Sequence, residues 1–210
     1  MTLVMWLGRR FARLATNLVV RFPWLWGLFR RPLALQFDRL ASRWDEIRSP
    51  GHLDSLGAAL AALESPRRVV DLGTGTGAAA VLTAQLFPEA EIVGVDLSPG
   101  MIEEARRKLP PELAGRVRFE VADSAALPFQ DGEFDLATLA NMIPFFDELA
   151  RVLAPGGHAA FGFSMGADTP IYVPPERLRL ELGRRGFTEF AEFSAGTGTA
   201  LTTRKGTKRQ

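Results

Sequence analysis

From residue 68 onward, short apolar runs alternate with stretches in which apolar residues recur at helical spacing. The runs predict strands over residues 68–72, 91–96, 117–122, 134–139 and 159–163. The stretches between them predict helices over residues 78–86, 99–109 and 145–153. The strand runs lack strict alternation of polar and apolar residues, as expected of strands that are covered on both faces. Strands that alternate with helices predict β–α–β crossovers and a parallel sheet.

The C-terminal part has a different pattern. Two prolines begin a predicted helix over residues 174–186, and Gly186 ends it. Two alternating stretches follow, residues 187–193 and 199–204, on either side of a glycine-containing turn. This pattern predicts a β-hairpin, which adds an antiparallel pair to the parallel sheet.

The N-terminal arm, residues 1–31, predicts an amphipathic helix that Pro23 interrupts. Its large apolar residues share one predicted helical face: Leu7, Phe11, Leu14, Leu18 and Phe22. Arginines take the opposite side, and three of the four tryptophans lie in the arm. A basic, aromatic-rich helix of this kind is typical of a segment that lies in a membrane interface. The apolar stretch between Arg13 and Arg21 falls far short of the ~20 residues that a membrane span needs.

A second interpretation of the arm stays open. The apolar stripe can instead pack on the body of the protein, or on a second copy in a homodimer, as a lid. A twin-arginine signal and a transit peptide are weaker alternatives, because no clear cleavage site follows Arg9 and Arg10.

Composition narrows the function classes. The 210 residues carry a net charge of +1, but the arm holds six arginines and no acidic residue, so residues 32–210 are mildly acidic. The absence of cysteine excludes disulfides and thiolate metal sites and is compatible with the cytoplasm. With only two histidines, we expect no metal. The basic tail, residues 205–210, is too short to indicate a nucleic-acid partner.

Between the arm and the tail, the predicted domain organisation has two parts: cap helices over residues 32–64 and a core over residues 65–204.

A glycine turn carries the candidate chemistry. The chain runs VVDLGTGTG from Val69 to Gly77, so an apolar strand ends in a turn that opens the predicted helix over residues 78–86. Glycines reach positive φ and let a backbone approach a ligand, and the helix N-terminus offers N–H groups to an anion. Asp96 ends the next predicted strand, where a carboxylate can accept hydrogen bonds from ribose hydroxyls. The pattern predicts a nucleoside site.

The glycine spacing distinguishes between nucleosides. A dinucleotide fingerprint is G-x-G-x-x-G, whereas this chain has G-x-G-x-G with Asp71 before it. An acidic residue there would repel a pyrophosphate but attract a cationic amino-acid group. The string VVDLGTGTG resembles the first motif of class I S-adenosylmethionine-dependent methyltransferases, and the resemblance extends along most of Arg68–Gly157. It implies an α/β fold: a doubly wound, Rossmann-like sheet of seven mostly parallel strands, with an antiparallel last strand and helices on both faces.

The resemblance also implies roles for individual residues. Asp71 and the turn would hold the methionine part of S-adenosyl-L-methionine, Asp96 would hold the ribose, and Asp123 would bind the adenine amino group. The remaining cofactor contacts that it implies are Gly73, Thr74, Gly75, Gly77, Leu97, Met101, Ala122, Ser124 and Asn141. For Met101 a place in the core is an equal alternative, and for Asp123 a solvated loop is the alternative.

The acceptor side is less well defined. Asn141, at the end of the fourth strand, is the one catalytic candidate, because it would reach both cofactor and acceptor. The segment LQFDRLASRWD, residues 35–45, resembles the helix that caps the cofactor in many small-molecule methyltransferases. Its Phe37 and Trp44, with Phe145 and Tyr172, are the candidate acceptor-pocket residues. Simple core packing is the alternative for Phe37 and Trp44.

These observations predict a methyltransferase that acts on a small-molecule or lipid-like acceptor, in the cytoplasm or at the inner face of a membrane. Two other function classes stay open. One is a catalytically silent protein that binds the cofactor and is tethered by its arm. The other is a nicotinamide-dependent oxidoreductase, which the glycine spacing disfavours.

Overall fold

The structure, a computed structural model, describes residues 3–48 and 50–207, with side chains from Leu7 onward. The first residues of the expected arm, including the side chain of Trp6, and the last three of the expected tail lie outside the described residues.

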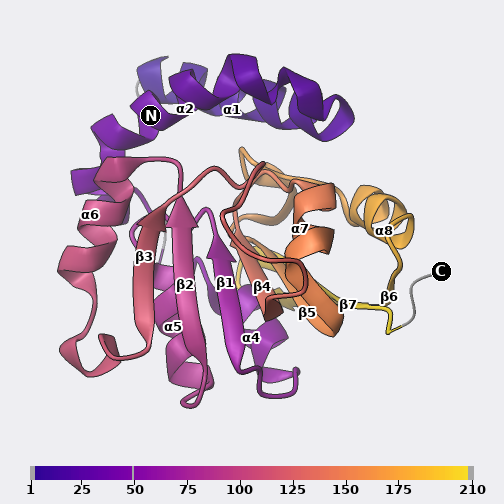
Figure 1. Ribbon diagram of the computed structural model, residues 1–210. Helices are drawn as coiled ribbons and strands as arrows, with labels where there is room; N and C mark the ends of the chain where they lie inside the picture. Colours follow the sequence, from indigo (N-terminus) through magenta and orange to yellow (C-terminus); the bar gives the residue numbers. More distant parts are fainter. Residues whose placement is uncertain (1–2, 49, 208–210) are drawn as a thin grey trace.

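A seven-stranded sheet forms the centre of the molecule (Figure 1), in the order β3-β2-β1-β4-β5-β7-β6. Five strands are parallel to one another, and β7 runs antiparallel to both of its neighbours. The strands are β1 (Arg68–Leu72), β2 (Glu91–Asp96), β3 (Val117–Val121), β4 (Phe134–Ala140), β5 (Leu153–Phe163), β6 (Phe187–Ala195) and β7 (Gly198–Lys205). The predicted fold class is therefore confirmed. The strand order reverses between β1 and β4, the point where such sheets bind ligands.

Helices cover both faces of the sheet. One face packs against α4 (Asp54–Ala61), α5 (Ala78–Leu86) and α6 (Pro99–Lys108) in a core that contains Leu56, Ala80 and Ile102. The other packs against α7 (Phe146–Val152) and α8 (Pro175–Gly183). Since both faces are buried, the parallel strands can be apolar at successive positions.

Local sequence sets several of the helix boundaries. Ser98 caps α6, because its Oγ accepts a hydrogen bond from the Met101 N–H at 3.1 Å, and Pro99 occupies the first helical position. Gly77, in the left-handed conformation, precedes α5. Pro175 begins α8.

The fifth strand begins earlier than predicted. The sequence predicts a strand over residues 159–163 after a turn at Pro155-Gly156-Gly157, whereas β5 begins at Leu153 and contains that segment. The pairing of β4 with β5 shifts register between Phe134 and Leu136, so the segment is an irregularity inside the strand.

The N-terminal helices lie across the carboxyl ends of the parallel strands (Figure 1). They are α1 (Leu3–Arg21), the 3-10 turn η1 (Pro23–Leu25), α2 (Trp26–Leu40), the 3-10 turn η2 (Ala41–Arg43) and α3 (Trp44–Ile47). The short 3-10 helices η3 (Pro111–Leu113) and η4 (Gly166–Asp168) complete the chain. The helix breaks before Pro23 as predicted, while the expected boundary between residues 31 and 32 falls inside α2. Lys205, expected in the tail, is the last residue of β7.

The apolar stripe of α1 packs on the body only in part: the packing interpretation holds for Phe11, whereas Leu7, Leu14 and Phe22 remain at the surface. The residues of α1 that are buried against the body are Ala12, Ala15, Thr16 and Val19. Small side chains let the helix approach the body closely, so the longer leucines of the stripe are left at the surface. Two arginines, placed by the sequence on the outer side, instead reach inward to η4: Arg13 donates to the carbonyls of Ala167 and Thr169, and Arg9 to that of Asp168. None of the described helices is long and apolar enough to cross a bilayer.

Candidate functional site

The turn after β1 is held by its own backbone. The N–H of Thr74 donates to the Val95 carbonyl of β2, and that of Gly77 donates to Thr74, both at 2.9 Å. The Gly75 N–H donates to Oδ2 of Asp96 at 2.9 Å. Two of the turn's glycine N–H groups therefore fix the loop in place rather than facing a ligand.

Glycine is required in this turn by conformation and by space. Gly73, Gly75 and Gly77 have φ of 66°, 54° and 86°, in the region that L-residues rarely adopt. A Cβ on Gly73 would overlap the Met142 side chain, and one on Gly75 would lie 3.1 Å from Nη2 of Arg48. Side chains thus surround a backbone surface that only glycine can present.

Asp71 lies beneath the turn and is 1% exposed. Its two carboxylate oxygens accept hydrogen bonds from the hydroxyls of Thr74 and Thr138, each at 2.6 Å. Burial raises the pKa of Asp71 to about 6, against the lowering effect of the two hydroxyls and of the nearby Arg48 charge. In this arrangement the carboxylate ties the turn to β4, and its predicted contact with the methionine part remains a prediction.

Asp96 ends β2 with both oxygens already hydrogen-bonded. Oδ1 accepts the Ser98 N–H and Oδ2 the Gly75 N–H, each at 2.9 Å. Burial raises the pKa of Asp96, and the backbone hydrogen bonds oppose that rise. A carboxylate offers about four acceptor positions, so two remain for a pair of ribose hydroxyls.

Asp123 follows β3 and meets a residue of the arm. The Trp26 indole Nε1–H lies 2.9 and 3.1 Å from its two oxygens, and Arg30 forms an ion pair with it at 3.8 Å. The Ala125 N–H also donates to Oδ1. The alternative of a merely solvated Asp123 is therefore wrong, because the arm covers this carboxylate.

The other residues predicted to lie near adenine have different surroundings from Asp123. The Ala122 N–H donates to the Asp96 carbonyl at 3.0 Å, so it is used within the sheet. Ser124 is buried, and Leu97 is half-buried. Met101 is 1% exposed, which favours the core role over a place beside adenine.

Asn141 adopts the left-handed conformation, with φ of 54°. Its N–H donates to the Gly162 carbonyl and its Oδ1 accepts the Ser164 N–H, at 2.8 and 2.9 Å. Asparagine tolerates this conformation better than most residues. The strained backbone and the anchored side chain fix where the chain leaves β4, at the sheet edge that binds ligands.

The four acceptor-pocket candidates fall into two groups. Phe37 and Phe145 pack on one apolar cluster under the arm, which includes Leu33 and Ile143, and Phe37 stacks edge-on against Trp44. Tyr172 stacks instead against Phe163 and lines a separate cavity of about 220 Å³ beside α1 and α8. The structure therefore brings three of the candidates together and leaves Tyr172 apart.

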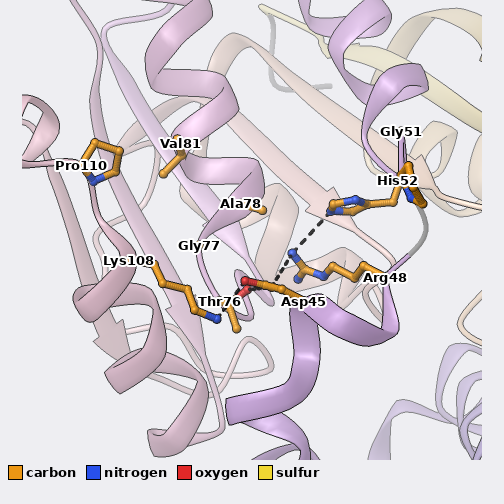
Figure 2. A pocket seen from close by; sticks show the side chains of 11 residues that line it. Asp45, Arg48, Gly51, His52, Thr76, Gly77, Ala78, Val81, Lys108 and Pro110 are labelled. Atoms are coloured by element: carbon orange, nitrogen blue, oxygen red, sulfur yellow. Dashed lines mark hydrogen bonds and ion pairs between the residues drawn. The ribbon is translucent and has the colours of Figure 1, made fainter.

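A larger cavity of about 570 Å³ adjoins the turn on the side of α4 to α6 (Figure 2). Asp45 connects its walls: it accepts hydrogen bonds from Thr76 and Lys108 at 2.7 and 2.8 Å and forms an ion pair with Arg48 at 3.7 Å. Arg48 also lies 3.4 Å from His52 Nε2. Asp96 and Asp123 do not line this cavity; they lie at the strand ends near α2.

Arg48 and Trp44 have N–H donors that suit the carboxylate of a bound amino acid. No sequence pattern marks Arg48 as a site residue. The Arg48 guanidinium reaches the space above Gly75, and it lies over the Trp44 ring. The buried Nε1–H of Trp44 has no hydrogen-bond partner, which is costly unless a ligand supplies one. Together with the acceptors on Asp96 and Asp123, these donors suit a ligand with an amino-acid end and a nucleoside end.

Comparison with known proteins agrees with this geometry. The family model described as a methyltransferase domain matches residues 69–157. Residues 69–157 therefore match a methyltransferase domain. The match includes the glycine turn and all three carboxylates discussed above.

Curated relatives match this methyltransferase domain and its surroundings. A demethylmenaquinone methyltransferase of Thermus thermophilus is 44% identical over 138 residues, which cover 58% of this chain and 60% of the relative. A trans-aconitate 2-methyltransferase of Methylobacterium nodulans is 40% identical over 149 residues, covering 63% and 55%. The chain thus spans little more than half the length of these relatives.

Solved structures share the fold of the methyltransferase domain. An S-adenosylmethionine-dependent methyltransferase from Aquifex aeolicus has a TM-score of 0.60 at 18% identity, covering 78% of this chain and 97% of that one. Human N-acetylserotonin methyltransferase, in complex with S-adenosylmethionine, has a TM-score of 0.63 at 20% identity, covering 82% and 56%.

Proposed function

We propose that this protein transfers a methyl group from S-adenosylmethionine to a small, lipid-like acceptor. The observation that carries the proposal is the pair of carboxylates, Asp96 and Asp123, at the ends of adjacent strands beside the glycine turn of a methyltransferase domain. Asp96 would bind the ribose, Asp123 the adenine amino group, and Arg48 with Trp44 the methionine carboxylate.

The cofactor supplies a sulfonium, which is already a strong electrophile. The chain's own task is to hold the acceptor in line and to exclude water. Asn141, which is held by Gly162 and Ser164, would orient the acceptor. Asp96 and Asp123 lie at the same edge but would be engaged by the cofactor, and the Asp71 carboxylate is buried under Thr74 and Thr138. The acceptor atom would therefore have to be nucleophilic without a carboxylate acting as general base.

The apolar cluster under the arm favours an apolar acceptor. Relatives act on demethylmenaquinone, on trans-aconitate and on malonyl-[acyl-carrier protein], which differ greatly in polarity. The aromatic cluster of Phe37, Phe145 and Trp26 under the arm suits a ring or chain better than a tricarboxylate. We therefore favour a quinone-like or other lipid-like acceptor, taken from a membrane surface by a chain that resides in the cytoplasm.

One observation supports a second candidate function. The arm's Trp26 holds Asp123, and Met142 covers Gly73, as expected if the protein binds its cofactor weakly or is catalytically silent. A nicotinamide-dependent oxidoreductase has no comparable support, since the glycine spacing and the family match both point elsewhere.

Transfer of labelled methyl groups tests the proposal. The protein is incubated with methyl-labelled S-adenosylmethionine and either demethylated quinones in detergent or trans-aconitate. We expect label in the quinone fraction, and at least tenfold less with Asp96→Ala. Label in trans-aconitate alone would reject the lipid-like acceptor. Cofactor binding without transfer to any acceptor would favour the silent protein.

A further inference from the structure

The outward faces of the N-terminal helices expose large apolar side chains. Leu7 and Leu14 on α1 are 52% and 55% exposed, and Leu28 and Leu35 on α2 are 69% and 57% exposed. Trp24, in the turn between the helices, is 77% exposed. Most of the exposed large apolar residues that the structure describes lie in this one segment, which is more than the scattered exposure of an ordinary surface.

Their spacing places them on one side of the molecule. Leu7 and Leu14, like Leu28 and Leu35, are seven residues apart, so each pair shares a helical face. The opposite faces of the same helices carry the buried Ala15, Val19 and Leu33. Figure 1 shows α1 and α2 in one layer across the strand ends, so both apolar faces are directed away from the sheet.

Arginines accompany these leucines. Arg21 follows Leu14 by seven residues, and Arg31 lies between Leu28 and Leu35 at helical-neighbour spacing; both are exposed. Arg9 and Arg13 are not part of this surface, because they donate to carbonyls of η4. No acidic residue occurs before Asp38, and Asp38 is turned inward, where it accepts hydrogen bonds from Ser98 and Gly100.

We propose that the outward faces of α1 and α2, together with Trp24, dock onto the interface of an anionic phospholipid bilayer. Leucines and a tryptophan would enter the boundary between headgroups and acyl chains, and arginines would meet the phosphates. A second copy of the chain is a poorer occupant. Pairing two such faces would bring arginine against arginine with no acidic residue to compensate.

In this orientation α2 lies between the bilayer and the candidate site for cofactor and acceptor. Trp26 and Leu33 on the inner face of α2 contact the site and its apolar cluster, while Leu28 and Leu35 on the outer face contact lipid. This consequence rests on the proposed function, since it matters only for a lipid-like acceptor. Docking itself does not depend on methyl transfer.

Vesicle flotation tests the proposal with the whole chain. We expect binding to vesicles of phosphatidylcholine with phosphatidylglycerol, weak binding to phosphatidylcholine alone, and loss of binding at high salt. Arg21→Gln with Arg31→Gln should lower the partition coefficient about 25-fold, taking about fivefold for each arginine. Leu28→Gln with Leu35→Gln should lower it at least about tenfold. The fluorescence of Trp24 should shift to the blue on binding, and Trp24→Phe should abolish most of the shift.

Matched controls come from exposed residues outside the N-terminal helices. Leu180→Gln, at an exposed leucine of α8, and Arg67→Gln, just before β1, should bind vesicles as the unmodified chain does. Binding of S-adenosylhomocysteine should be unchanged in every variant, which separates docking from failure of the cofactor site. Equal binding to neutral and anionic vesicles, or no binding to either, would overturn the proposal. So would a dimer in solution that Leu28→Gln with Leu35→Gln abolishes, because the face would then pair with a second copy.

Discussion

Three carboxylates near the turn act in different ways because their surroundings differ. Asp96 and Asp123 accept hydrogen bonds from N–H groups and are reached from the strand ends. Asp71 is enclosed, and two hydroxyls are its hydrogen-bond donors. Neutral donors stabilise a buried charge less than a charged partner does, so burial dominates and the pKa of Asp71 rises to about 6.

The raised pKa of Asp71 predicts a pH-dependent stability. Between pH 4 and 6 the folded chain holds a proton on Asp71 that the unfolded chain has lost, so this residue's contribution to stability falls as the pH rises. The difference between 3.8 and about 6 corresponds to about 3 kcal/mol. Asp71→Asn cannot titrate, so its free energy of unfolding relative to the unmodified chain should rise by about 2 kcal/mol of this amount between pH 4 and 6.5, measured by urea unfolding.

A control variant separates this effect from general acid unfolding. Leu180→Gln changes an exposed residue of α8 and no titratable group, so its stability relative to the unmodified chain should stay constant with pH. A constant difference for Asp71→Asn across the same range would show that the Asp71 carboxylate ionises normally under the turn.

Sequence could predict residues whose roles depend on their position at a strand end. Asp96 and Asp123 follow buried strands, and parallel strands align those ends at one edge. Trp26 and Arg48 were not predictable in the same way. Trp26 meets Asp123 across 97 positions of sequence, and the role of Arg48 depends on how α3 folds over Gly75. No local pattern encodes such contacts.

Among the elements, the strands could be predicted from the sequence, whereas the packing of the arm stayed open between a membrane interface and the body. Buried parallel strands are apolar at nearly every position, so their ends stand out in the sequence; β1 and β2 match the prediction. On α1 the apolar stripe did not decide which face is buried, because the close approach to the body selects the small Ala15 and Val19. The larger Leu7 and Leu14 of the same helix are exposed.

The contact between Trp26 and Asp123 predicts how firmly the arm is held. Trp26→Phe keeps a ring to stack on Phe145 but loses the N–H donor to a charged acceptor. Such hydrogen bonds contribute about 1.5–3 kcal/mol when buried, and less at this half-exposed position. Trypsin should therefore cleave after Arg30 about tenfold faster in this variant; the bond after Arg31 is resistant because Pro32 follows it. Trp24→Phe, at a surface tryptophan, should be cleaved at the unmodified rate; equal rates for both would mean that the indole N–H does not hold the arm.

Across the whole molecule, the features with functional meaning meet at the carboxyl ends of the parallel strands. The glycine turn, Asp96, Asp123 and Asn141 lie at this edge, and α1 and α2 cover it. At the amino ends, Asp135 of β4 accepts the N–H groups of Arg67 and Arg68, so this carboxylate joins β4 to the start of β1. We therefore propose that the ligand binds between the carboxyl ends of the strands and the arm.

Calorimetric titration with S-adenosylhomocysteine and with NAD tests the central claim most directly. We predict that S-adenosylhomocysteine binds and NAD does not. Asp96→Ala should weaken that binding by about 2–4 kcal/mol, since two charge-assisted hydrogen bonds to the ribose are lost. Tighter binding of NAD, or an affinity for S-adenosylhomocysteine that Asp96→Ala leaves unchanged, would contradict the account.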